Sequence, residues 1–510
     1  MDVGSILERS ASLYPGRPAV IDGHRVIDYR ELDERVNRLA NAMLGAGLKP
    51  GDRVIDLQHN AHQYIEADLA LARAGLVRVP VNTRLTSADW AFIANDSQAR
   101  GLIYGEGFAG AAEELLDRLG GLDLVVGVEK GPGMQYEDLL SKASAIAIRA
   151  RRSRGEVVSI NYSSGTTGRP KGCMRTVGNR LASTVDFLVN LFEGGLNASD
   201  VWLHAGPITH ASGLFVLPHI AVGACQVVLA KFDPLEAVHL VEKHHVTGTV
   251  WVPTMIERVI TNDLSGHDLG SLRRVAYAGS PMTPDRIRAA NEILAGRMVQ
   301  FYGMVEAIPP LTVLTQKDHD EHRGHARLGS AGRPCLAVEV DIVGEEGVGV
   351  ATGDVGELVI SGEHVMGGYW GMEEATGKAL RDGRLWTGDM AWRDEGGYVT
   401  IVDRKNDMII SGGYNVYPRE VEDLLKTDAS VFDAVVIGVP DPDWGQAVTA
   451  AVVLRPGATA DLDRLLDLCR QNLAQFKRPK RIDFVDAIPH TTAGKINRKA
   501  ILELLANQVG

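Results

Sequence analysis

The chain has 510 residues, of which 45% are hydrophobic and 23% are charged. This composition is typical of a folded globular protein and excludes the disordered and fibrous classes. The formal net charge is -12, which disfavours a duplex-binding protein because such proteins need a broad basic surface. At about 150 residues per domain, the length predicts two to four domains, or one large α/β unit with an appendage.

The cysteine spacing and the N-terminal segment indicate in which cellular compartment the protein is expected. Cys173, Cys225, Cys335 and Cys469 lie far apart, so they form neither a CxxC metal or redox pair nor a disulfide framework. The first residues lack the basic stretch and apolar core of a signal peptide, and no apolar run reaches the roughly 18 residues of a membrane span. We expect a cytoplasmic protein in a reducing environment.

The first part of the chain alternates between helical and strand patterns. Leu32, Val36 and Leu39 have helical spacing and predict a helix over residues 30–44, and Asp28 with Glu31 predicts a capping box at its start. A strand at 54–57, a helix at 64–74 and a strand at 77–80 are predicted next. This order favours a mostly parallel sheet covered by helices. The same rhythm recurs at residues 201–229, 247–260 and 272–278.

The later part of the chain begins with a β-rich segment. Strands separated by glycine-rich turns are predicted at 338–343, 356–361 and 398–402. The α/β pattern then returns, with helices at 418–425 and 462–473 and strands at 434–438 and 448–454. We predict a boundary at Asp403–Asp407, which gives domains over residues 1–404 and 405–510.

The strongest chemical signal is the run from Tyr162 to Gly172. Its glycines allow the backbone N–H groups to turn toward an anion, its hydroxyls add donors, and Lys171 adds a point charge suited to phosphate. Pro170 before the lysine and Gly172 after it make a helix start improbable, so this is not a Walker A loop. The alternative is a flexible surface loop, but eleven residues in this order favour a polyphosphate site.

With this run the chain resembles the adenylate-forming superfamily, which includes acyl-CoA synthetases, aryl-CoA ligases, luciferases and peptide adenylation domains. The resemblance covers essentially the whole chain. It implies an α/β fold with a large N-terminal domain of two α/β-sheet subdomains plus a β-barrel-like subdomain, and a small mobile α+β C-terminal domain. It also implies that the loop binds ATP through Ser163, Ser164, Gly165, Thr166, Thr167, Gly168 and Lys171.

Further motifs follow in the order that the family has. Pro207–His210 resembles the segment whose histidine lies near the acyl path, and Phe301–Glu306 resembles the motif whose tyrosine stacks on adenine and whose glutamate holds Mg²⁺. The family usually has threonine where this chain has Val305. The resemblance implies nucleotide contacts by Gly279, Ser280, Tyr302 and Gly303.

The last third of the chain carries the remaining motifs. Asp389, Ile401 and Arg404 match the segments that hold the ribose, and Asn406 occupies the hinge position, where the family usually has Asp or Lys. The Pro489–Lys495 run matches the loop that presents the catalytic lysine, Lys495. The resemblance further implies a thiol channel and a CoA site formed by Gly412, Gly413, Tyr414, Phe476, Arg478 and Lys480.

Two charged segments have plainer interpretations. The basic run around Phe476 to Arg481 could be a solvated face, but its Arg and Lys residues beside an aromatic side chain suit CoA phosphates and adenine. The Asp318–His325 cluster lacks zinc-site spacing, and we expect it to be a solvated connector.

The acyl pocket is the least specified part of the site. Small residues leave room and Met304 adds adaptable apolar surface, which favours a medium-sized apolar, aromatic or alicyclic acid over acetate. By resemblance the pocket is formed by His210, Ser212, Phe215, Ala278, Gly279, Met304, Val305 and Ile308.

The expected activity is that of an AMP-forming acid–thiol ligase with ATP, Mg²⁺ and CoA, with Lys495, His210 and Glu306 as catalytic residues. The expected partners are a small carboxylic acid, ATP and CoA, with no nucleic acid, and a homodimer is one candidate assembly. Three alternatives stay open. They are a ligase that passes the acyl group to an amine or a carrier protein, a catalytically weakened nucleotide-binding protein, and a luciferase-type oxygenase.

Overall fold

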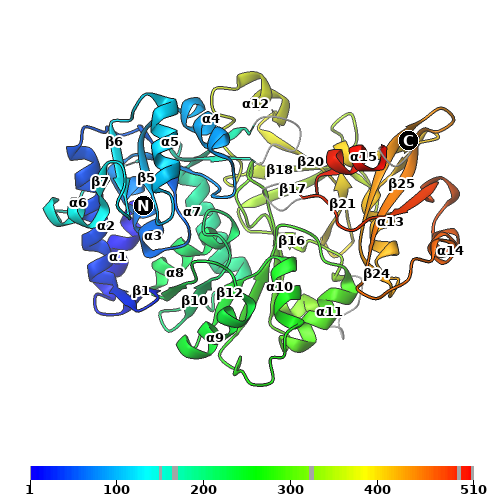
Figure 1. Ribbon diagram of the computed structural model, residues 1–510, viewed down its shortest axis with the longest axis horizontal. Helices are drawn as coiled ribbons and strands as arrows, with labels where there is room; N and C mark the ends of the chain where they lie inside the picture. The colour runs from blue at the N-terminus through cyan, green and yellow to red at the C-terminus, as the bar shows by residue number, and fades with distance from the viewer. Residues whose placement is uncertain (1, 149–151, 164–169, 321–326, 491–495, 507–510) are drawn as a thin grey trace. The chain divides into compact units, whose positions relative to one another are not determined.

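The computed structural model describes residues 2–148, 152–163, 170–320, 327–490 and 496–506 (Figure 1). The chain divides into two compact units. The first comprises residues 1–340 and 360–385, and the second comprises residues 341–359 and 386–510. This division follows spatial contacts, and the predicted functional boundary at 404/405 stays a prediction.

A seven-stranded sheet in the first unit carries the ends of the predicted phosphate loop. Its order is β7-β6-β5-β3-β4-β8-β9, and all neighbours are parallel except the antiparallel pair β8 and β9. Helices α3 and α4 are among those that pack against it (Figure 1). The strands are β3 (Arg53–Leu57), β4 (Val77–Pro80), β5 (Ala99–Tyr104), β6 (Leu124–Gly127), β7 (Met134–Gln135), β8 (Val157–Tyr162) and β9 (Gly172–Thr176).

A nine-stranded sheet in the same unit has the order β16-β15-β14-β13-β12-β10-β11-β1-β2. Its strands are parallel from β14 to β1, and the outer neighbours are antiparallel. The strands are β1 (Pro18–Asp22), β2 (Arg25–Asp28), β10 (Val201–His204), β11 (Cys225–Val228), β12 (Gly248–Val250), β13 (Arg274–Tyr277), β14 (Met298–Tyr302), β15 (Thr312–Leu314) and β16 (Arg333–Pro334).

The helices of the first unit alternate with these strands, as the sequence pattern predicts. Helix α7 continues directly into a π-helix at Phe187–Leu191, and a 3₁₀ helix at Ala211–Phe215 leads into α8. The α-helices are α1 (Val3–Leu13), α2 (Tyr29–Gly45), α3 (His62–Ala74), α4 (Ser87–Asp96), α5 (Ala109–Leu119), α6 (Tyr136–Lys142), α7 (Val177–Asp186), α8 (Val216–Val222), α9 (Pro234–His244), α10 (Pro253–Ile260), α11 (Pro284–Ile293) and α12 (Glu373–Ala379).

Two further sheets account for the remaining strands. The order β17-β18-β20-β19, with β21 beside β20, forms the predicted β-rich segment, and β23-β22-β25-β24, with β26 beside β25, forms the C-terminal sheet. Their elements are β17 (Val338–Val343), β18 (Gly356–Gly362), β19 (Leu380–Arg381), β20 (Arg384–Arg393), β21 (Val399–Arg404), β22 (Ile409–Ser411), β23 (Tyr414–Val416), α13 (Pro418–Leu425), β24 (Val431–Asp441), β25 (Gly445–Leu454), α14 (Leu462–Asn472), β26 (Arg481–Phe484) and α15 (Arg498–Ala506).

The start of α2 illustrates a partly correct prediction. The Asp28 carboxylate accepts the backbone N–H of Glu31, as an N-cap residue does. The reciprocal half of the capping box is absent between these two described residues, because the Glu31 carboxylate pairs with Arg25 at 2.7 Å. Leu32, Val36 and Leu39 are fully buried, so the amphipathic pattern was correctly interpreted.

The Asp318–His325 segment corrects an expectation. Asp318 and His319 are buried and not solvated, and His319 Nε2 lies 3.0 Å from the Tyr277 hydroxyl. Residues 321–326 lie outside the described part of the chain. In that described part, no group of three or more His, Cys, Asp or Glu side chains could hold a metal ion.

All four cysteines are free and buried, which agrees with the prediction that the chain has no disulfide framework. Burial raises the pKa of each thiol, to about 11 for Cys469 and to about 12 for Cys225. Within the residues that the structure describes, no helix combines the length and the apolar character that crossing a membrane requires.

Candidate active site

The antiparallel pair β8 and β9 holds both ends of the predicted phosphate loop. Ser163 donates its backbone N–H to the Lys171 carbonyl at 2.9 Å, and a strand, not a helix, begins at Gly172. A Cβ atom on Gly172 would lie 2.7 Å from Ile160 Cγ2, so the close return of the chain requires glycine there. Five predicted phosphate ligands lie outside the described residues, namely Ser164, Gly165, Thr166, Thr167 and Gly168.

Lys171 and Glu306, predicted from separate motifs, meet at Tyr369. The Lys171 ammonium nitrogen lies 5.0 Å from the Tyr369 ring centroid, and the Tyr369 hydroxyl donates to Glu306 Oε1 at 3.1 Å. Burial, with the nearby Glu306 charge, raises the pKa of Tyr369, so the hydroxyl stays a donor at neutral pH. Sequence reasoning missed Tyr369, because its role depends on contacts with segments far away in the chain.

The segment that carries Tyr369 is bound to both motifs through its backbone. Met366 donates its N–H to the Glu306 carbonyl at 2.9 Å, and Trp370 donates to the Gly172 carbonyl at 2.7 Å. Val305 packs against the small apolar cluster that Tyr369 forms with its buried neighbours. An apolar residue therefore suits position 305, although the family usually has threonine there.

This arrangement brings one cation and one carboxylate to the same tyrosine. An ammonium group neutralises phosphate oxygens, and a carboxylate is a hard ligand for a Mg²⁺ ion that keeps several waters. Glu306 is partly exposed and receives the Tyr369 hydroxyl on one oxygen only, so its carboxylate fits a magnesium ligand.

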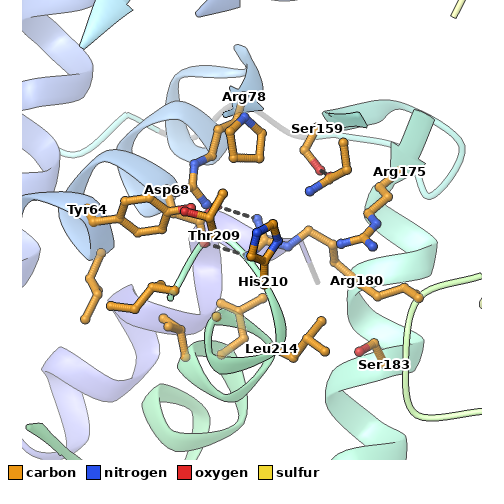
Figure 2. Close-up of a pocket in the computed structure, with 18 of the residues that line it drawn as sticks. Tyr64, Asp68, Arg78, Ser159, Arg175, Arg180, Ser183, Thr209, His210 and Leu214 are labelled. Atoms are coloured by element: carbon orange, nitrogen blue, oxygen red, sulfur yellow. Dashed lines mark hydrogen bonds and ion pairs between the residues drawn. The ribbon is translucent and has the colours of Figure 1, made fainter. Parts of the chain in front are cut away.

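A buried asparagine holds the turn that presents His210. Asn60 accepts the Ile208 N–H at 2.8 Å and donates to the Gly206 and Leu229 carbonyls at 2.8 and 3.0 Å. His210 and Ile308 line a cavity in the first unit, in which His210 lies between side chains of several elements (Figure 2). No sequence motif marked Asn60 as the residue that positions this turn.

The other predicted acyl residues do not line that cavity. The Ser212 hydroxyl lies 2.8 Å from His204 Nδ1. Phe215 stacks on Trp202 with a centroid distance of 4.2 Å and is fully buried. The remaining four predicted positions are also absent from the lining, namely Ala278, Gly279, Met304 and Val305.

The nucleotide motifs of β13 and β14 lie in the first unit as well. Gly279 has a φ of 91°, in the left-handed region that favours glycine, and forms part of the turn after β13. Tyr302 ends β14, and a Cβ on Gly303 would lie 2.6 Å from Pro309. Ser280 is exposed. The adenine contacts of these residues stay predictions.

In the second unit, the predicted ribose ligands Asp389 and Arg404 are direct neighbours. They face each other across β20 and β21, with Arg404 Nε 2.6 Å from Asp389 Oδ1. Asp389 is buried, whereas the Arg404 side chain is 46% exposed. Ile401 belongs to the same strand β21 as Arg404. A buried acceptor beside an accessible cation suits two ribose hydroxyls.

Asp403 precedes Arg404 and is buried beside the predicted hinge. Its carboxylate accepts the backbone N–H groups of Arg404 and Arg419 at 2.7 and 2.9 Å. Burial nevertheless raises the pKa of Asp403 to about 6. Asn406 lies in an exposed 3₁₀ turn at Lys405–Asp407.

The predicted CoA residues form two aromatic contacts in the second unit. Tyr414 stacks on Phe476 with a centroid distance of 4.6 Å and is 59% exposed. The Lys480 ammonium lies 3.9 Å from the ring centroid of Trp444, and Gly412 donates its N–H to the Trp444 carbonyl. Gly412 and Gly413 both have positive φ angles, 59° and 82°. Trp444 was missed because no motif contains it.

Arg478 has a structural contact that the basic run did not predict. Its Nε donates to the Leu473 carbonyl and its Nη2 to the Arg470 carbonyl, both at 2.9 Å, at the C-terminal end of α14. A guanidinium is favourable there because the helix dipole is negative at that end. The catalytic lysine predicted near the C-terminus, Lys495, lies outside the described residues.

Comparison with known proteins identifies the family. The family described as AMP-binding enzyme matches residues 7–370, and its C-terminal domain family matches residues 420–495. The chain therefore belongs to the AMP-binding enzyme family, the adenylate-forming superfamily that the motifs indicate.

Relatives and solved structures match along almost the whole chain. A feruloyl-CoA synthase from Amycolatopsis is 38% identical over 97% of both chains, and a 2-succinylbenzoate–CoA ligase from Geobacillus kaustophilus is 35% identical over 98% of this chain and 97% of its own. The amide bond synthetase McbA from Marinactinospora thermotolerans superimposes with a TM-score of 0.90 at 29% identity, covering 99% of this chain and all of its own.

The Tyr369 contact predicts a graded loss of ATP binding. Tyr369→Phe removes the hydrogen bond to Glu306 but keeps the ring beside Lys171. We expect the KM for ATP to rise about three- to tenfold, since one hydrogen bond contributes about 0.5–1.5 kcal/mol net. Tyr369→Ala also removes the ring and should cost more. Steady-state pyrophosphate release measures both, and an unchanged KM in both variants would contradict the assignment.

The raised pKa of Asp403 predicts a pH-dependent stability. The folded state holds a proton that the unfolded state releases between about pH 4 and 6, so unfolding free energy falls as pH rises through this window. The Asp403→Asn variant cannot titrate at this position. As pH rises from 4 to 7, we expect the difference in unfolding free energy between the variant and wild type to shift in favour of the variant by about 3 kcal/mol at most. Calorimetric unfolding measures this, with the exposed Glu395→Gln as control. Parallel pH curves for wild type and Asp403→Asn would contradict it.

Proposed function

We propose that the protein activates a carboxylic acid with ATP and transfers the acyl group to CoA. The observation that carries this proposal is the meeting of Lys171 and Glu306 at Tyr369, beside the strand pair that flanks the phosphate loop. Family membership and relatives named as CoA ligases over nearly the whole chain support the same activity.

In the first half-reaction, a carboxylate oxygen of the acid attacks the α-phosphorus of ATP. A new P–O bond forms, the bond to the β-phosphate oxygen breaks, and pyrophosphate leaves, giving an acyl-adenylate. Such a step needs positioning and charge neutralisation and no covalent nucleophile. Lys171 neutralises phosphate oxygens, and Tyr369 holds the Glu306 carboxylate in place. Mg²⁺ bound by Glu306 would neutralise further phosphate charge.

The remaining nucleotide contacts are assigned by motif. Asp389 and Arg404 would hold the ribose hydroxyls, and Lys495 would bridge the acid carboxylate and the α-phosphate. In the second half-reaction, the CoA sulfur attacks the acyl carbon, a C–S bond forms, and AMP leaves. We infer that the domain after residue 404 turns about Asn406 between the two steps, which removes Lys495 and brings Gly412 and Gly413 to the thiol.

The acceptor distinguishes the main function from its alternative. An amide bond synthetase has a similar overall structure, so an amine acceptor is a second candidate. The stacked Tyr414–Phe476 pair and the Lys480–Trp444 contact favour CoA, because a partly exposed aromatic pair beside cations suits adenine and phosphate. The cytoplasmic location and the homodimer stay predictions.

An acceptor experiment tests the function directly. The enzyme with ATP, Mg²⁺ and a panel of aromatic, alicyclic and aliphatic acids should release pyrophosphate, and mass spectrometry should find acyl-CoA when CoA is offered. Amino acids offered in place of CoA should give no amide product. Amide formation without acyl-CoA would favour the alternative acceptor, and no pyrophosphate with any acid would favour a weakened nucleotide-binding protein.

The two half-reactions predict opposite effects of one substitution. Lys495→Ala should slow acyl-adenylate formation by about 100-fold or more, since one preorganised charge at a transition state contributes that much. Thioester formation from supplied acyl-AMP and CoA should stay within a few-fold of wild type. Lys499→Ala, four residues further along, is the matched control. Equal loss in both half-reactions would contradict the role of Lys495.

A further inference from the structure

The cavity beside His210 is lined by polar side chains that the proposed chemistry does not use. It lies within the first unit and is formed by α3, β4, β8, β9, α7 and the segment that follows His210 (Figure 2). It offers about 60 Å³ to the centres of water-sized molecules. At roughly 10–15 Å³ for each ordered water, this space could hold a small polar group.

The strand register places one row of side chains on a wall of the cavity. Arg78 on β4 faces Ser159 on β8, and Ser159 faces Arg175 on β9. Residues paired across neighbouring strands point to the same face of a sheet, so these three side chains reach the cavity together. Helix α7 adds Arg180 and Ser183, which are three residues apart and therefore share a helix face.

Two of the three arginines have buried carboxylate partners. Arg78 Nε donates to Asp56 at 2.7 Å, and its Nη1 lies 3.0 Å from Asp68. Arg180 pairs with both oxygens of Asp68, at 2.9 and 2.7 Å. These two cations and two anions balance each other. Burial raises the pKa of Asp56, so any protonation there would leave the cavity more positive.

Arg175 has no such partner in the part of the chain that the structure describes. Its Nε makes no hydrogen bond, and it forms no ion pair with the carboxylates around the cavity. Glu306 attracts it electrostatically, but these two described side chains form no ion pair. Burial lowers the pKa of Arg175 to about 10, so the guanidinium is charged at neutral pH. The Arg175 side chain is half-buried, with its Nε fully buried. A charge in such a place destabilises a fold unless a ligand or another charge pairs with it.

The cavity is also where the acid is expected to pass. His210 and Ile308, two of the predicted acyl residues, line it, whereas Phe215 packs in an aromatic cluster with Phe187 and Trp202. A guanidinium can donate two parallel hydrogen bonds to one carboxylate, so a carboxylate is a well-matched ligand for Arg175.

We propose that this cavity binds the far end of the acid substrate, and that the preferred substrates carry a second anionic group, a carboxylate, which pairs with Arg175. Arg175 is thus a specificity-determining residue, and this inference rests on the proposed function. It replaces the apolar acid that the sequence favoured with a dicarboxylic one.

Matched acids test the proposal. We compare kcat/KM for a series of dicarboxylic acids of increasing length with kcat/KM for the monoamide of each acid. The monoamide has the same shape but no second charge. At one length, wild type should favour the dicarboxylate in kcat/KM by about tenfold or more, as hydrogen bonds between charged groups allow. Arg175→Met should remove this preference while changing the monoamide by less than about twofold, and Arg175→Lys should restore part of it.

Ligand-free stability gives a second readout. Because Arg175 pairs with no carboxylate among the described residues, Arg175→Met should keep or raise the Tm, whereas Arg180→Met should lower it by leaving Asp68 with fewer partners. The matching dicarboxylate should raise the Tm of wild type and not of Arg175→Met. This binding measurement separates the inference from the proposed function, since it needs no turnover.

Three results would overturn the inference. The first is that wild type has equal kcat/KM for dicarboxylate and monoamide at every length. The second is that Arg175→Met loses kcat/KM equally for both acids and also has a lower Tm. The third is that chloride or inorganic phosphate changes the Tm of wild type as much as the dicarboxylate does. Pyrophosphate release with apolar acids alone would leave the proposed function standing and reject only the second anionic group.

Discussion

The antiparallel pairing of β8 with β9 is the constraint on which the first unit's site depends. The other neighbours in the seven-stranded sheet are parallel, so this one return of the chain fixes both ends of the phosphate loop within a hydrogen bond of each other. The same pairing aligns Ser159 with Arg175 and thereby builds one wall of the cavity. It also positions Gly172, whose carbonyl accepts the backbone N–H of Trp370, the residue after Tyr369. A sliding of the register by one residue would turn Arg175 to the opposite face.

Local patterns were sufficient for much of the fold. Strand β17 and helix α13 begin and end where the sequence predicts, because turn residues and apolar periodicity both act over a few residues. Strand β9 was not predicted, since Gly172–Thr176 is short and its stability comes from pairing with β8 and with residues 367–370. Long-range pairing has no local signature, which is why strands of this kind are missed.

The candidate site likewise contains residues that local motifs predict and residues that only long-range contacts reveal. Each of the residues Lys171, Glu306, Asp389 and Arg404 lies within a continuous sequence motif. In the structure, Lys171 and Glu306 both contact Tyr369 in the first unit, and Asp389 pairs with Arg404 in the second. The roles of Tyr369, Asn60 and Trp444 depend on partners more than thirty residues away in the sequence, so no motif marks them. Arg175 shows the converse limit, because its proposed role depends on its having no carboxylate partner in the described part of the chain, and sequence motifs do not reveal which side chains pair in space.

The four buried thiols have a practical consequence for assays of this enzyme. Reagents that report free sulfhydryl groups react with thiolates that they can reach, and burial both blocks access and keeps these side chains protonated. The colour that such a reagent develops would therefore measure the amount of free CoA thiol, with little background from the folded protein. Loss of that signal in samples withdrawn and quenched at successive times would follow acyl transfer, and a slow rise in enzyme without CoA would report unfolding.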